Sequence, residues 1–224
     1  MVSGPRSAST ASASESKDPV VYVIDDDESI RHVFDGLVRS VGLHVETFES
    51  PREFLAFPKY DAPSCLILDV RLRGESGLAF QEEALRSGVR MPILFMTAHG
   101  DIEMTVKAMK AGALDFFPKP FRDQDMLDAI SDALRRDAER LASEKALSTI
   151  RASYETLTPR EREVLKFVVA GLLNKQIAFE LSLSEITVKI YRGQVMKKMA
   201  SRSLPDLVRM AEALGIHPNR LAEP

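Results

Sequence analysis

Acidic residues at the ends of apolar runs are the part of this sequence with the clearest capacity for chemistry. Residues 20–28 read VVYVIDDDE, so a largely β-branched run stops at three aspartates and a glutamate. Carboxylates of this kind can ligate a metal ion or act as nucleophiles. Like charges packed so tightly repel one another, and the run contains no basic residue to compensate them. The cluster therefore needs a function to explain it.

Similar apolar runs recur along the first half of the chain, each followed by a segment with helical periodicity. The runs are VVYVI, HVETF, CLILD, PILFM and ALDFF. Strands that alternate with helices predict an α/β fold, a doubly wound parallel sheet of five strands with five helices. The carboxyl ends of such strands share one edge, where ligands bind. The residues that fall at these ends, and that we expect to converge, are Asp25, Asp26, Asp69, Thr97 and Lys119.

Taken singly, each strand-end residue has a plainer interpretation. An aspartate after a strand is usually a helix cap, a threonine is usually a turn residue, and Lys119 before Pro120 fits an ordinary loop. Their joint order and placement is what favours a shared site. We expect Asp27 and Glu28 to cap the first helix instead, because carboxylates there suit the helix dipole.

The second half of the chain has a purely helical pattern. Residues 158–161 read TPRE, which is typical of a capping box at the start of a helix. Asn174 begins a short helix, NKQIAFEL, and Ser184 caps a further helix that runs to Met199. Two short helices joined by a tight turn predict a helix-turn-helix in a second, smaller all-α domain.

Charge divides the chain at about the same place. From residue 157 onward there are 11 Lys/Arg and 7 Asp/Glu, a net +4, and the rest of the 30 basic and 33 acidic residues gives a net −7. An acidic half and a basic half suggest two domains with different partners. We expect a disordered leader over residues 1–18, an α/β domain over 19–136, a helical linker over 137–156 and the all-α domain over 157–224.

The linker leaves two interpretations open. Few helix-breaking residues occur between Gln124 and Tyr154, so a long helix is predicted there. Either the fifth helix of the first domain continues into a solvated linker, or the continuation forms a coiled-coil dimer seam. A seam would place Asp137, Glu144 and Ser148 where apolar residues are wanted.

Other features of the composition exclude some classes of protein. No apolar run approaches the roughly 18 to 20 residues that span a bilayer, and the Ser/Ala-rich N-terminal stretch lacks the apolar segment of a signal peptide. The single cysteine, Cys65, lies within an apolar run, which indicates a reduced thiol in a core. We therefore expect a cytoplasmic protein without a membrane partner.

The motifs of the first half resemble those of the receiver domain of bacterial two-component response regulators. They are IDDD, ILDVRLRGESG, MTAHG and FFPKPF, all in order within residues 19–136. In the second half, LTPREREVL, NKQIA and SEITVK resemble the LuxR/FixJ-type helix-turn-helix domain. The whole chain thus resembles a FixJ-class transcriptional response regulator. That resemblance implies a histidine kinase and double-stranded promoter DNA as partners, and a regulator that at most removes its own phosphoryl group slowly, not an enzyme.

The resemblance implies a role for each strand-end residue. Asp69 is the expected phosphoacceptor, while Lys119 and Thr97 contact the phosphoryl oxygens. Because the attacking carboxylate and the phosphoryl group are both anionic, a hard cation such as Mg²⁺ is needed between them. The residues implied to hold Mg²⁺ are Asp26, Asp69 and the main-chain carbonyl of Arg71, with Asp25 acting through water.

The resemblance also implies a switch. Thr97 moves toward the phosphoryl group and Phe116 turns inward, and the Lys119–Pro120 peptide bond is cis. Many relatives have tyrosine where this chain has Phe116, so a switch hydroxyl is missing here. The surface remodelled by the switch covers roughly residues 101–136, through which we expect a homodimer to form on phosphorylation.

The predicted recognition helix has two faces. We expect Val188, Tyr191, Val195 and Met199 to face the domain core, because they recur at helical spacing. The candidate DNA-binding residues of the opposite face are Ile186, Lys189, Ile190, Gly193 and Lys197. Ile190 can meet only apolar groups such as thymine methyls, or is an ordinary exposed aliphatic. Further candidates, for phosphate contacts, are Asn174, Lys175 and Arg192.

Two other functions remain open at this point. A phosphatase of the haloacid dehalogenase type would use Asp25 and Asp27 as its D-x-D pair, but it needs further acids on a strand after Lys119, where this chain enters a helix. An atypical regulator would keep the fold and bind DNA without phosphorylation. Sustained turnover of a phosphomonoester would favour the phosphatase, and a single labile phosphoryl group per chain would exclude it.

Overall fold

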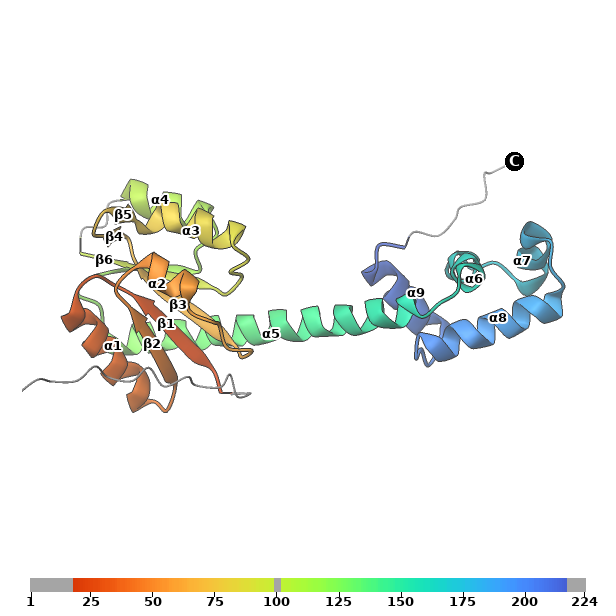
Figure 1. Cartoon of the computed structure of the whole chain (residues 1–224), viewed down its shortest axis with the longest axis horizontal. Coiled ribbons are helices and arrows are strands. Elements are labelled where there is room, and N and C mark those ends of the chain that lie inside the picture. Colours follow the sequence, from red (N-terminus) through yellow and green to blue (C-terminus); the bar gives the residue numbers. More distant parts are fainter. Residues whose placement is uncertain (1–17, 99–101, 217–224) are drawn as a thin grey trace, which may run out of the picture. The chain divides into compact units, whose positions relative to one another are not determined.

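The computed structural model describes residues 18–98 and 102–216, and the chain separates into two compact units after Leu141 (Figure 1). Most of the leader expected over residues 1–18 therefore lies outside the described residues.

A five-stranded parallel sheet with the order β2-β1-β3-β6-β7 forms the centre of the first unit, as the sequence predicted. Its strands are β1 (Val20–Ile24), β2 (His44–Phe48), β3 (Ser64–Asp69), β6 (Ile93–Thr97) and β7 (Asp115–Pro118). Asp69 pairs in register with Met96, and Thr97 pairs with Pro118. The carboxyl ends of β3, β6 and β7 therefore lie side by side at one edge.

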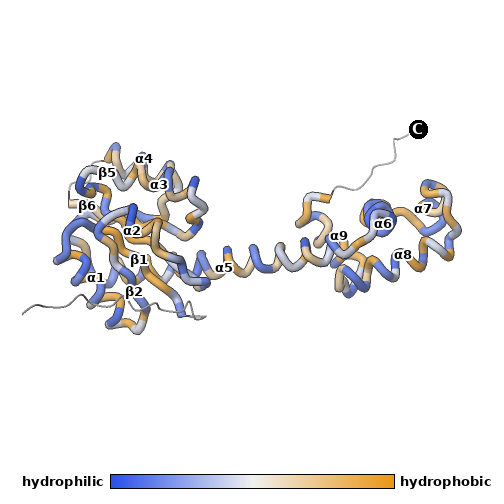
Figure 2. Tube along the Cα trace, in the orientation of Figure 1, coloured by the Kyte–Doolittle hydropathy of each residue, from blue (hydrophilic) through white to orange (hydrophobic). Residues whose placement is uncertain are grey.

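Five helices cover the two faces of this sheet. They are α1 (Glu28–Ser40), α2 (Pro51–Ala56), α3 (Gly77–Arg86), α4 (Ile102–Lys110) and α5 (Asp123–Glu155). Strand side chains alternate between the faces, so Tyr22 packs in one core with Phe54 of α2 and Phe80 of α3, whereas Val23 packs in the other with Phe34 of α1. Both faces are covered, which explains why the central strands β1, β3 and β6 are mostly apolar and fully buried, whereas the edge strands β2 and β7 also contain polar residues (Figure 2).

Local sequence signals place the helix starts. Asp27 is the N-cap of α1, where its carboxylate accepts a hydrogen bond from the Ser29 N–H at 2.8 Å, so the expected cap is confirmed. Ser50 caps α2 in the same way, with Pro51 in the first turn. One element was not anticipated: a small antiparallel hairpin of β4 (Arg71–Leu72) and β5 (Glu75–Ser76) follows the strand that ends in Asp69.

The long helix predicted after Gln124 is present as α5. Its residue Asp137 is 1% exposed and accepts a hydrogen bond from the Ser64 N–H at 2.9 Å. The contacts of the first unit thus extend beyond residue 136, and Asp137 is occupied within its own chain. Cys65, beside Ser64, is buried and reduced, as expected, and burial raises the pKa of its thiol.

The second unit is all-α around one apolar core. Its helices after α5 are α6 (Pro159–Val169), α7 (Asn174–Leu181), α8 (Glu185–Lys198) and α9 (Leu204–Ala213). The capping box of Thr158 and Glu161 begins α6, and Ser182, with φ 53°, makes the turn between α7 and α8. The predicted helix-turn-helix is therefore present.

None of the helices in the described part of the chain is both long enough and apolar enough to cross a membrane.

Candidate functional site

Three carboxylates meet at the carboxyl edge of the sheet. One oxygen each from Asp25, Asp26 and Asp69 lies within 4.8 Å of the others. Asp25 is 1% exposed and Asp69 is 7% exposed. A carboxylate that only capped a helix would be expected to lie in solvent, so the burial of these two acids needs another explanation. All donors are oxygens, which suits a hard cation such as Mg²⁺. The residues present therefore fit the ion that the resemblance implied.

Lys119 supplies a cation to this cluster. Its Nζ lies 2.7 Å from Oδ2 of Asp25 and 2.6 Å from Oδ2 of Asp69. Burial raises the pKa of the Asp25 carboxyl, and the Lys119 hydrogen bond only partly offsets that rise. Burial lowers the pKa of the Lys119 ammonium, but its bonds to the two acids outweigh that effect and leave the pKa raised. The ammonium is thus held charged between two acids.

The two expected switch residues lie on neighbouring strands. Thr97 is fully buried at the end of β6, and its main-chain oxygen accepts a hydrogen bond from the Lys119 N–H at 2.7 Å. The Lys119–Pro120 bond is cis. Phe116 is half-buried on β7, where it pairs in register with Phe95 and packs against the core. The structure therefore brings Thr97 to the acidic edge, with Phe116 on the adjacent strand.

Sequence reasoning missed a second cation beside the acids. Nε of Arg73 lies 3.0 Å from Oδ2 of Asp26, so this carboxylate has a basic partner from outside the acidic run. Arg31 was missed as well; its guanidinium donates to the main-chain oxygen of Asp25 at 2.6 Å. Arg73 and Asp26 are far apart in the sequence, and Arg31, six residues after Asp25, lies outside the i+3 and i+4 spacings of helix neighbours, so the local patterns used above identify neither pairing.

Gly77 is a third residue that the sequence analysis did not single out. A Cβ on this residue would overlap the main-chain oxygen of Asp69. Its N–H donates to the Val70 oxygen at 2.9 Å, and the Arg71 N–H donates to the Asp69 carboxylate at 2.9 Å. The loop that begins α3 is therefore packed directly against the backbone of Asp69, where only glycine fits.

The recognition helix α8 has the two faces that the sequence predicted. Val188 and Val195 are fully buried and Met199 is nearly so, with Tyr191 packed against them. The outward-facing candidates are all exposed: Ile186 (74%), Lys189, Ile190 (55%), Gly193 and Lys197. Space around the Gly193 Cα is open, so packing within the chain does not require a glycine there.

The residues expected to contact phosphate differ in their surroundings. Lys175 is exposed on α7. Asn174 and Arg192 bond to each other instead, the guanidinium donating to the Asn174 Oδ1 at 2.9 Å. This bond links the start of α7 to α8. Two large apolar side chains that the sequence analysis did not consider are also exposed, Leu173 (69%) just before α7 and Phe179 (84%) within it.

Comparison with known proteins assigns each half of the chain to a family. Residues 21–131 match the response regulator receiver domain family, and residues 155–211 match the luxR family of bacterial regulatory proteins. Nodulation protein W of Bradyrhizobium diazoefficiens is 54% identical over 200 residues, covering 89% of this chain and 88% of that protein. The chain is a two-component response regulator of the receiver–LuxR type.

A further relative and a solved structure have the same organisation. The transcriptional regulatory protein FixJ of Azorhizobium caulinodans is 42% identical over 204 residues, covering 91% of this chain and 97% of that protein. The response regulator StyR superposes with a TM-score of 0.79 at 45% identity, covering 87% of this chain and 98% of that chain.

Membership in this family settles the coarse function. The chain is a DNA-binding transcription regulator with a kinase partner, in a family of regulators that are not typical enzymes. The alternative of a haloacid dehalogenase-type phosphatase is wrong, because the receiver family accounts for the first half and the luxR family for the second. Receiver domains typically bind Mg²⁺ at an acidic pocket, which corresponds here to the three clustered aspartates.

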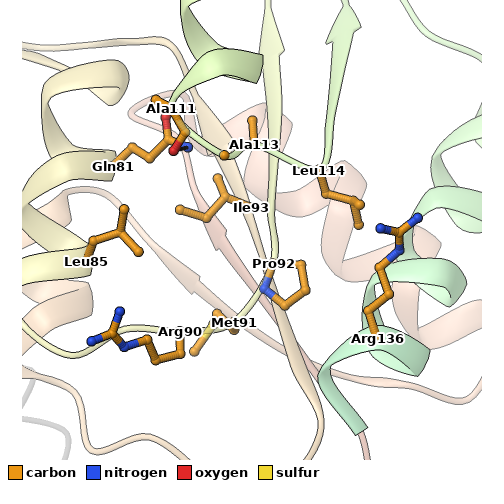
Figure 3. A pocket seen from close by; sticks show the side chains of 11 residues that line it. Gln81, Leu85, Arg90, Met91, Pro92, Ile93, Ala111, Ala113, Leu114 and Arg136 are labelled. Atoms are coloured by element: carbon orange, nitrogen blue, oxygen red, sulfur yellow. Dashed lines mark hydrogen bonds between the residues drawn. The ribbon is translucent and has the colours of Figure 1, made fainter. Parts of the chain in front are cut away.

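A separate cavity of about 430 Å³ lies at the opposite edge of the receiver sheet (Figure 3). Pro92 and Ile93 at the start of β6 form part of its wall, together with Leu85 of α3 and Arg136 of α5. Gln81 also lines it and donates to the Ala111 oxygen at 3.1 Å. None of the sequence-predicted site residues lines this cavity, so the acidic cluster is not part of it.

Proposed function

We propose that Asp69 accepts a phosphoryl group from a histidine kinase and that this modification controls DNA binding. The observation that carries the proposal is the convergence of the Asp69 carboxylate with two further acids and with the Lys119 ammonium, 2.6 Å away. Transfer of a phosphoryl group requires in-line positioning and charge neutralisation more than covalent help. The Lys119 ammonium beside Asp69 supplies part of that charge neutralisation.

Each neighbour of Asp69 has its own part in this proposal. Bound Mg²⁺ supplies the charge that lets the carboxylate and the phosphoryl group approach. Asp26, Asp69 and the main-chain carbonyl of Arg71 hold the ion, with Asp25 acting through water. Lys119 neutralises phosphoryl oxygens and keeps Asp69 oriented before transfer. Slow loss of the phosphoryl group to water is part of the same proposal.

The output of the receiver is dimerisation through the surface around residues 101–136. Three apolar side chains on α4 support this, since Ile102 is 85% exposed, Val106 44% and Met109 43%. They follow a helical spacing and so form one stripe. Exposed apolar stripes of this kind mark interaction surfaces. Thr97 and Phe116 transmit the change by shifting the receiver between two existing conformations.

Dimerisation matters because one helix-turn-helix domain offers only a small surface to DNA. Two linked domains on adjacent half-sites gain affinity through effective concentration, without new contacts. The outward residues of α8 read bases in the major groove, and Lys175 contacts phosphate. A regulator that binds promoter DNA works where the chromosome is, so the proposal retains the expected cytoplasmic location. It also retains the expected domains, residues 19–136 and 157–224, joined by residues 137–156, of which Asp137 contacts the first domain through Ser64.

The test compares the parent protein with Asp69→Asn in the presence of Mg²⁺ and a small phosphodonor. Intact mass spectrometry should show one phosphoryl group on the parent and none on the variant. Under these conditions sedimentation should show a dimer for the parent and a monomer for Asp69→Asn. Operator binding should tighten for the parent and stay unchanged for the variant. If Asp69→Asn dimerises and binds DNA as the phosphorylated parent does, the protein is an atypical regulator that acts without phosphorylation.

A further inference from the structure

The hairpin after Asp69 places Arg73 beside the cluster of Asp25, Asp26 and Asp69. β4 and β5 pair antiparallel, and the two residues between them are Arg73 and Gly74. Gly74 has φ +81°, the left-handed region that a glycine adopts readily at the third position of a type II turn. The hairpin is tied to the phosphoacceptor, because the Arg71 N–H donates to the Asp69 carboxylate at 2.9 Å. Arg73 is therefore held close to the site by a defined turn.

The ion pair that results involves the one acid that Lys119 does not contact. Nε of Arg73 lies 3.0 Å from Oδ2 of Asp26, whereas Nζ of Lys119 contacts Asp25 and Asp69. Three carboxylates are thus matched by two basic side chains. This arrangement leaves much less repulsion among the acids than their spacing in the sequence suggested.

The two basic side chains differ in how easily they can leave. Lys119 is 16% exposed and bridges two acids, so moving it would strip both of a buried partner. Arg73 is 80% exposed and holds a single contact to Asp26, which is itself 21% exposed. A guanidinium with this exposure is hydrated by solvent as soon as its contact with Asp26 breaks. Arg73 is therefore the displaceable cation of the site.

We propose that Arg73 competes with the divalent cation for Asp26 and so sets the cation concentration at which this receiver becomes competent for phosphorylation. This rests on the proposed function, in which Asp26 is a direct ligand of Mg²⁺. A bound dication and the guanidinium both need the same carboxylate, and they repel each other at that range. Binding of the ion releases Arg73 into solvent, whereas Lys119 stays in place.

The size of the effect follows from the exposure of the pair. Because exposed ion pairs are weak, removing Arg73 should tighten Mg²⁺ binding by about two- to fivefold at low ionic strength. Added salt screens charges in solvent, so the difference between parent and variant should shrink as KCl is raised.

The experiment titrates the full-length protein with Mg²⁺ alone, by calorimetry, without a phosphodonor. Arg73→Ala should bind the ion about two- to fivefold more tightly than the parent. Arg122→Ala is the matched control, since it removes the same charge from an exposed side chain three residues after Lys119 and alters none of the proposed metal ligands. A clearly smaller change in Mg²⁺ affinity for Arg122→Ala supports the pairing of Arg73 with Asp26, and an equal change overturns it, because the general loss of one positive charge would then explain both.

A double-mutant cycle with Asp26→Asn makes the assignment specific. In that background Arg73→Ala should no longer tighten Mg²⁺ binding, because the shared carboxylate is gone. If Arg73→Ala binds Mg²⁺ as the parent does, while Asp26→Asn binds it more weakly, the competition between Arg73 and the cation is overturned but the metal site is not. A parent that binds no Mg²⁺, or binds it independently of Asp26, overturns the metal site of the proposed function as well. Thermal melts of each variant without metal verify that it is folded.

Discussion

The acidic edge of the receiver and the outer face of α8 are two functional surfaces built on opposite plans. The receiver site draws residues from the ends of β1, β3, β6 and β7, and its Asp25 and Asp69 are nearly buried. The outer face of α8 comes from a single helix, and its Ile186 and Ile190 are 74% and 55% exposed. One site is assembled by tertiary structure, and the other by helical periodicity alone.

This contrast predicts different responses to substitution. In the receiver site each charged group has a close partner, so a change in one residue alters the others. On α8 the exposed side chains share few partners, so their contributions should be close to additive.

Gly77→Ala should produce the largest loss, because the added Cβ would overlap the main-chain oxygen of Asp69. Overpacking against a backbone atom typically destabilises by about 1–3 kcal/mol. We expect a loss of that size in urea unfolding of the receiver, together with slower phosphorylation. The control is Gly36→Ala in α1, where the space for a Cβ is open and stability should rise by up to about 1 kcal/mol. Equal stability of the two variants would show that Asp69 does not depend on this contact.

Glu161→Gln tests whether coupled charged groups occur only in the receiver site or also in the DNA-binding domain. Glu161 is buried in the second unit, where it accepts hydrogen bonds from the Thr158 N–H and from Lys198 Nζ, both at 2.7 Å. Glutamine keeps the capping box but loses the charge, which should cost about 1 kcal/mol at neutral pH. The DNA-binding domain would then also contain a charged group whose partner is remote in the sequence.

The pH dependence of that variant gives a second measurement. Burial raises the pKa of Glu161, but the bonds from Lys198 and Thr158 outweigh burial and hold it below the ordinary value of 4.5. The stabilisation is therefore present above that value and is lost as the pH falls through the folded-state pKa. Glu161→Gln should flatten this acid dependence of the melting temperature, whereas Glu163→Gln, at an exposed ion pair with Arg160, should not.

Ile190→Ala and Lys175→Ala test the independence of single contacts on DNA. Ile190→Ala should relax the preference at one thymine position, at about 1 kcal/mol. Lys175→Ala should weaken binding to all DNA sequences alike. It should also reduce the slope of log affinity against log salt concentration by about one unit. The double variant should show the sum of the two effects in binding titrations. Equal losses on all sequences from Ile190→Ala would show that this side chain does not read a base.

Gly193→Ala should have a small effect on stability. We expect it to stabilise the domain but to weaken DNA binding. The position is helical and open, so alanine should stabilise the domain by up to about 1 kcal/mol. If DNA approaches this part of α8 closely, the added methyl group should weaken operator binding at the same time. Thermal melts and binding titrations on the same preparation separate the two effects. Tighter binding would mean that DNA does not approach Gly193.

Much of this protein could be predicted from the sequence because the relevant forces are local. Alternation of apolar runs with helical segments predicted the five strands of the sheet, and short capping patterns predicted the starts of α1, α6 and α8. The face of α8 that carries Val188 and Val195 follows from a period of 3.6 residues. The edge shared by Asp25, Asp69 and Lys119 follows from a general property of parallel sheets.

Only the tertiary structure decided which charged groups are partners. Arg73 pairs with Asp26, Asp137 with the Ser64 N–H, and Asn174 with Arg192. Gly77 must remain small because α3 begins against the backbone of Asp69. Such contacts join segments distant in the chain, and they depend on turn geometry, strand register and the rotation of each helix. Periodicity and capping describe only a residue's near neighbours along the chain, so they do not carry this information.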